Sequence, residues 1–108
     1  MAGSIIIADN QQLPVSSIQF DYLAHRIRAS FQLGEDSCRD EVFFPHDIGG
    51  MPFISTKSLD PLGFRIFSLA VERAHSKALK EDLYSTFTNL WERLLEIVRA
   101  DSRLDATQ

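Results

Sequence analysis

Hydrophobic positions recur most regularly in the last third of the chain. At 100° per residue, the final part of this stretch places its large apolar side chains on an arc of roughly 160°. The residues of the arc are Leu83, Tyr84, Phe87, Leu90, Trp91, Leu94, Leu95, Ile97 and Val98. A surface helix needs an arc of about 100° or a little more. We therefore predict a helix whose remaining apolar surface is covered by a second contact, from this chain or from another protein.

A second helix is predicted to begin at residue 60, where Asp60 can cap it and Pro61 suits the first helical position. One unbroken helix over 61–100 would be about 60 Å long at 1.5 Å per residue, which exceeds the diameter of so small a domain. We therefore predict a break near Lys80 and an antiparallel helix pair. Because neither Gly nor Pro lies there, one continuous, dimer-forming helix is the alternative.

The first third of the chain predicts two strands and a helix. Ser4 to Ala8 is a β-branched run, and Gln11 to Val15 can pair with it as an edge strand that contains a proline. Ser16 and Gln19 have the spacing of a capping box, which favours a helix over residues 17–33. The same segment also alternates polar and apolar residues with period two, so a strand is the alternative.

Two short apolar runs in the middle of the chain predict a β-hairpin. They span residues 41–44 and 52–56, and the turn between them contains Gly49 and Gly50. The polar stretch 35–40 before them is predicted to be a loop.

Together these elements predict an α+β fold, in which a small antiparallel sheet packs against one helix and a C-terminal antiparallel helix pair. The sheet would combine the N-terminal strand with the central hairpin. A content of 44% hydrophobic and 24% charged residues is typical of a globular protein. We expect residues 1–108 to form a single globular domain, with 101–108 as a frayed tail.

Charge and cysteine content restrict the function classes. Fifteen acidic and 11 basic residues give a formal charge of −4, and no run of Lys or Arg could follow a phosphate backbone, so nucleic-acid binding is disfavoured. No segment approaches the roughly 20 apolar residues of a membrane span. Cys38 is the single cysteine, which excludes an intrachain disulfide and favours a reducing, cytoplasmic location.

The main candidate for site chemistry is the pair His46 and Asp47, which lies beside Gly49 and Gly50. The other two histidines do not have a metal-binding spacing relative to this pair, and the glycines lack the longer pattern of a phosphate loop. We therefore predict no catalytic, cofactor-binding or metal-ligating residues and no cofactor. A small enzyme or ligand-binding domain with a site at this turn is the alternative.

Aromatic side chains at the edge of a broad apolar arc are typical anchors of protein interfaces. The predicted protein-contact residues are Tyr84, Phe87, Trp91, Leu95, Val98 and Phe44. We predict a non-catalytic protein that regulates or neutralises a partner protein by covering its surface, such as an anti-activator of a transcription regulator. A toxin-immunity protein is the alternative. Homodimerisation through the last helix is also expected.

Overall fold

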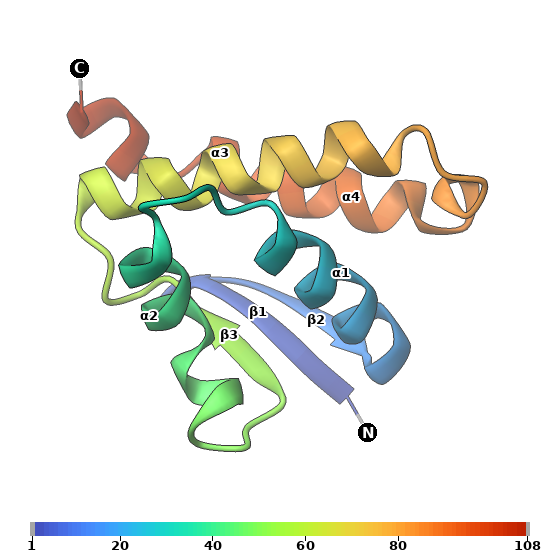
Figure 1. Ribbon diagram of the computed structural model, residues 1–108, viewed down its shortest axis with the longest axis horizontal. Helices are drawn as coiled ribbons and strands as arrows, with labels where there is room; N and C mark the ends of the chain where they lie inside the picture. The colour runs from blue at the N-terminus through green and yellow to red at the C-terminus, as the bar shows by residue number, and fades with distance from the viewer. Residues whose placement is uncertain (1, 108) are drawn as a thin grey trace.

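The computed structural model describes the backbone of residues 2–107 and the side chains of residues 2–105. Within that range a small sheet is covered by helices (Figure 1). The elements are β1 (Ala2–Ala8), β2 (Gln11–Ser16), α1 (Ser17–Ala29), α2 (Asp36–Asp47), β3 (Phe53–Ser55), α3 (Pro61–Ala78), α4 (Tyr84–Arg99) and the 3-10 helix η1 (Ser102–Thr107). The predicted α+β class is confirmed.

The sheet has the strand order β2-β1-β3, with β1 antiparallel to β2 and parallel to β3. Buried Ile5 on β1 pairs with Leu13 on one side and with Ile54 on the other. A parallel neighbour requires a long crossover, which α1 and α2 supply. The sheet is therefore mixed, which corrects the antiparallel arrangement and the central hairpin expected from the sequence.

Residues 35–47 account for that correction, because the predicted loop and first hairpin strand form α2. No side chain caps the N-terminus of this helix, and Pro45 lies inside it. Contacts with α1 hold it in place: Arg28 Nη1 donates a hydrogen bond of 2.9 Å to Asp47, and the Arg28 guanidinium lies 4.3 Å from the centroid of the Phe43 ring. Tertiary packing therefore outweighs the weak local signals.

Helix α1 forms as its capping box predicts. The Ser16 hydroxyl accepts a 3.2 Å hydrogen bond from the backbone N–H of Gln19, and the Gln19 side chain accepts one of 2.9 Å from the Ser16 N–H. The helix ends at Ala29, and the chain turns at Gly34, whose φ of 92° favours glycine. Helix rather than strand is thus confirmed for the first part of residues 17–33.

Helices α3 and α4 lie side by side and run in opposite directions (Figure 1). The carboxylate of Asp60 accepts a 2.7 Å hydrogen bond from the N–H of Gly63 and so caps α3. Residues 79–83 separate the two helices, which confirms the predicted break near Lys80.

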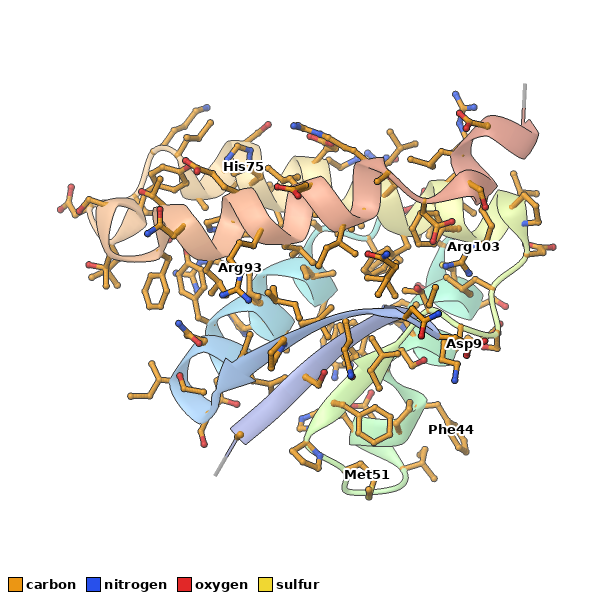
Figure 2. All side chains as sticks on the ribbon, turned by 180° about the vertical axis from the view of Figure 1, so that it is seen from behind. Asp9, Phe44, Met51, His75, Arg93 and Arg103 are labelled. Carbon is orange, nitrogen blue, oxygen red and sulfur yellow. The ribbon has the colours of Figure 1, made fainter. Side chains whose placement is uncertain are left out.

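Helices α1 and α2 cover the same face of the sheet, while α4 contacts both α3 and β2 (Figures 1 and 2). The sheet, α1 and the helix pair therefore enclose one shared core.

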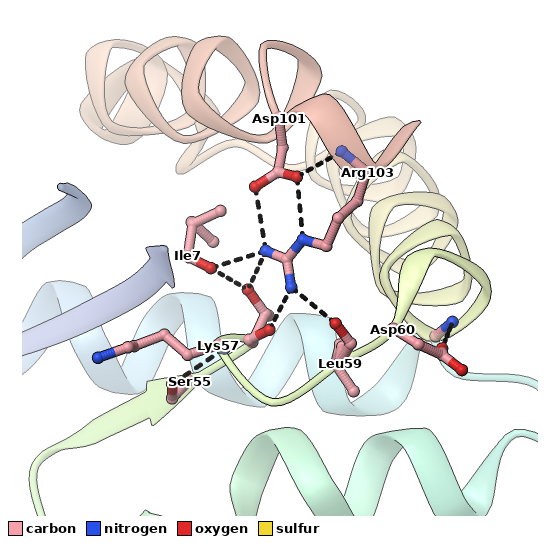
Figure 3. A network of polar contacts seen from close by, with 9 residues as sticks. Ile7, Ser55, Lys57, Leu59, Asp60, Asp101 and Arg103 are labelled. Carbon is pink, nitrogen blue, oxygen red and sulfur yellow. Dashed lines mark hydrogen bonds and ion pairs between the residues drawn. The ribbon is translucent and has the colours of Figure 1, made fainter. Parts of the chain in front are cut away.

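Within the segment expected to fray, Arg103 makes hydrogen bonds to distant parts of the chain (Figure 3). Its Nη1 donates to the carbonyl oxygens of Thr56 and Leu59 at 2.6 and 3.0 Å, and its Nη2 donates to that of Ile7 at 2.8 Å. Its Nε donates to Asp101 at 2.9 Å. One side chain thus joins the start of η1 to the end of β1 and to the loop before α3. We call this arrangement the Arg103 clamp.

The carboxylate of Asp101 is almost fully buried within the clamp. Burial alone would raise its pKa, but the hydrogen bonds from the Arg103 side chain and backbone outweigh that effect and lower the pKa below its usual value. Asp101 is therefore ionised in the folded protein at neutral pH.

Replacing Arg103 with alanine removes the donors to three backbone carbonyls and leaves Asp101 buried without its cation. We expect Arg103→Ala to lower the free energy of unfolding at pH 7 by about 3 kcal/mol. Arg99→Ala is the matched control, because Arg99 forms two 2.9 Å hydrogen bonds with Glu72 at the surface and should cost at most about 1 kcal/mol. Urea denaturation measures both values, and equal losses would contradict a special role for the clamp.

The lowered pKa of Asp101 also predicts an acid dependence of stability. A depressed carboxyl pKa stabilises the fold fully above the unfolded pKa of about 3.9, and this stabilisation is lost as the pH falls through the folded pKa. We therefore expect Asp101→Asn to be less stable than the wild type at pH 7, and to lose less stability between pH 5 and pH 2. Parallel acid dependences for the two proteins would contradict this assignment.

Candidate protein-contact surfaces

Three of the predicted contact residues, Trp91, Leu95 and Val98, are buried in the chain's own core. Trp91 has no exposed surface, and its indole N–H donates a 2.9 Å hydrogen bond to the hydroxyl of Tyr22 on α1. The ring of His75 on α3 packs 5.5 Å from the Trp91 ring, centroid to centroid. The broad arc of α4 is thus covered by α1, α3 and β2. In this conformation these three residues offer no surface to a partner, which corrects that part of the prediction.

Tyr84 and Phe87 keep part of their surface exposed at the first turn of α4. The Phe87 ring stacks on Tyr22 with centroids 3.8 Å apart, and the Tyr84 hydroxyl lies 3.1 Å from Nε2 of His75. Exposed Leu79 and Leu83 lie in the turn just before them. We call the four residues Leu79, Leu83, Tyr84 and Phe87 the turn patch.

The remaining predicted residue, Phe44, lies on the outward side of α2, and 58% of its surface is exposed. Its neighbours Val42 and Phe43 point into the core. Ile48, with 73% exposed, and Met51 follow it, and Phe44 and Met51 lie at the same end of the molecule (Figure 2). We call Asp40, Glu41, Phe44, Ile48 and Met51 the α2 face.

The excess negative charge of the protein is concentrated at the N-terminal end of this face. Residues 35–41 and Asp60 contain five acids and one arginine, a formal charge of −4, so the rest of the chain has equal numbers of acids and bases. A groove of about 340 Å³ lies between α2 and the start of α3. Burial, together with the nearby carboxylates of Glu41 and Glu35, raises the pKa of the Cys38 thiol in this groove to about 11. The thiol is therefore protonated at neutral pH.

The residues of the predicted turn site face different partners. Nδ1 of His46 lies 3.0 Å from the carbonyl oxygen of Met51, whereas the carboxylate of Asp47 bonds to Arg28. The hydrogen bond from Arg28 lowers the pKa of Asp47. His46 also lines a cavity of about 320 Å³ with Phe20. Among the described residues, no group of three His, Cys, Asp or Glu side chains is arranged to hold a metal ion.

Gly49 and Gly50 shape the same turn by close approach and by backbone conformation. A Cβ on Gly49 would lie 2.8 Å from the carbonyl oxygen of Pro45, and Gly50 has a φ of 64°. Both glycines are therefore explained by the geometry of the turn. Within residues 2–107, no helix has the length and apolar character needed to cross a bilayer.

Sequence reasoning did not group Ile48, Met51 and the acids of α2 with Phe44 as one contact surface, because it placed them in a loop and at a hairpin tip. A usable signal was present. At 100° per residue, Asp40, Phe44 and Ile48 are successively four residues apart and fall on one side of a helix. The exposed side of α2 could therefore have been found from the sequence if the segment had been treated as helical.

Comparison with known proteins gives two full-length similarities, while no protein-family model matches the chain. The chain is 43% identical over 104 residues to the immunity protein CdiI of Burkholderia pseudomallei, covering 96% of this chain and 95% of that protein. A solved structure is similar with a TM-score of 0.92 and 42% identity, covering 94% of this chain and 98% of the other. It shows the CdiA-CT toxin from Burkholderia pseudomallei E479 in complex with its cognate CdiI immunity protein.

Both comparisons therefore lead to one class, the immunity proteins. The similarity extends over nearly the whole of both chains. The chain belongs to the CdiI immunity protein family.

The hydrogen bond between the buried Trp91 indole and Tyr22 is expected to stabilise the fold. In Tyr22→Phe the indole N–H loses its acceptor inside the core, which should lower the free energy of unfolding by about 1–3 kcal/mol. Tyr84→Phe removes a hydroxyl from a half-buried position and should cost less than about 1 kcal/mol. Urea denaturation of the two variants compares them directly. An unchanged free energy of unfolding in Tyr22→Phe would show that the hydrogen bond adds nothing to stability.

Proposed function

We propose that this chain is an immunity protein that binds a CdiA-CT toxin domain and neutralises it. The observation that carries the proposal is the full-length similarity, at a TM-score of 0.92, to an immunity protein solved in complex with such a toxin. Similarity in fold alone would not be sufficient evidence for this function, because one fold supports many functions. Here the similarity in fold is accompanied by 42% sequence identity in the same comparison.

The proposed mechanism is steric and non-catalytic. The α2 face provides exposed apolar side chains beside polar ones, which is the usual composition of a protein interface. A stable interface requires about 800 Å² from each partner, so the chain would cover a broad surface of the toxin. The toxin would be inactive while that surface is covered.

Of the two regulatory functions considered from the sequence, the relatives support the immunity protein better than the anti-activator. The complex with a toxin also supports the expectation of a protein partner. The homodimer and the cytoplasmic location stay predictions.

The test uses the purified chain and the CdiA-CT domain of the Burkholderia pseudomallei E479 complex. We expect titration calorimetry to show a 1:1 complex, and co-expression of the chain to restore growth of cells that produce the toxin domain. Toxin activity should fall linearly with added chain and vanish at equivalence, because a steric inhibitor is consumed by binding. The absence of both binding and protection would overturn the proposal, and complete inhibition at substoichiometric amounts would overturn the steric mechanism.

A further inference from the structure

Helix α2 has an outward side that no other part of the described chain covers. Its inner side is already occupied, since Val42 and Phe43 lie in the core and the Cys38 thiol donates to the carbonyl oxygen of Gly63. Phe44 and Ile48 therefore contribute little to the fold, yet both are large, apolar and more than half exposed. Aromatic side chains in such positions are typical anchors of an interface.

We infer that the α2 face is the surface on which the toxin domain docks, and that the toxin meets it with a basic segment next to an apolar depression. This inference rests on the function proposed above. The apolar part, Phe44, Ile48 and Met51, would fill the depression. The carboxylate of Asp40, one turn earlier on the same helix, would face the basic segment, and so would that of Glu41, which also accepts a hydrogen bond from the hydroxyl of Ser58.

The charge of the α2 face favours a basic toxin domain as its partner. The acidic stretch around the N-terminal end of α2 carries the whole net charge of the chain, and Arg39 bonds to Asp36 and Asp40 without neutralising it. A basic partner gains favourable electrostatics there and associates faster. A second copy of the chain would place two acidic stretches in one symmetric interface, where like charges repel. The toxin is therefore favoured over self-association on this face.

The turn patch fits a docking surface less well. Its two aromatic residues are engaged inside the chain, Phe87 by stacking on Tyr22 and Tyr84 by its hydrogen bond to His75. The turn patch also lies at the end of the helix pair farther from α2 (Figure 1). The two surfaces can therefore be tested separately.

The experiment measures the affinity of the E479 CdiA-CT domain for single variants of the full chain by titration calorimetry. We expect Phe44→Ala and Ile48→Ala each to weaken binding at least about tenfold, because each removes an apolar contact from the centre of the interface. Leu83→Ala is the matched control. Leu83 is 56% exposed, close to the 58% of Phe44, but lies in the turn patch, so binding should change less than about twofold.

Charge is tested with a second matched pair. Asp40→Lys should slow association with the toxin domain about fivefold or more at low salt, and the difference should shrink at high salt. Glu92→Lys reverses an exposed charge on α4 and should alter the association rate much less. Thermal melting of each variant checks that all of them fold.

The outcomes separate this inference from the proposed function. If the wild type does not bind the toxin domain, the function itself fails. If the wild type binds, unchanged affinity in Phe44→Ala and Ile48→Ala together with weakening in Leu83→Ala would place the toxin on the turn patch and overturn the inference. Sedimentation of the free chain tests the third outcome, which is self-association through the α2 face. A dimer that Phe44→Ala converts to monomer, with unchanged toxin affinity, would assign the α2 face to a second copy.

Discussion

The fold depends on the packing of Trp91, a residue of α4, against α1 and α3. Its indole packs against His75 on α3 and donates its N–H to Tyr22 on α1, so it fixes the rotation of α4 about its own axis. With that rotation set, Leu94, Leu95 and Val98 turn inward and complete the core. A polar N–H in this position is tolerated because the Tyr22 hydroxyl accepts from it. The chain's own helices thus cover an arc that could have served a partner.

Local sequence signals predicted the elements that contain their own caps. The capping box at Ser16 and the Asp60 cap specify the starts of α1 and α3 without help from distant residues. Helix α2 has no such cap and contains Pro45, and it is held by contacts from elsewhere, such as that between Arg28 and Asp47. Its identity could not be predicted, because those contacts exist only after the chain has folded. The parallel pairing of β3 was missed for the same reason, since it depends on the crossover that α2 helps to form.

The predicted contact residues also show what the sequence can and cannot establish. Periodicity identified the apolar side of α4, since the buried residues of this helix all belong to the predicted arc, but it contains no information on whether the covering atoms come from the same chain. Trp91 and Phe44 were both predicted as contacts on the basis of size and aromaticity. Only the packing distinguishes them, because Tyr22 and His75 enclose the first while nothing in the described chain covers the outward side of the second.

The Arg103 clamp has a consequence for the timing of folding in the cell. It joins residue 103 to the first strand and to the loop before α3, so these contacts cannot form before residue 103 has been synthesised. The end of β1 and the loop before α3 are made much earlier and must remain without these hydrogen bonds until then. This part of the fold therefore becomes fully stable only after residue 103 has emerged from the ribosome.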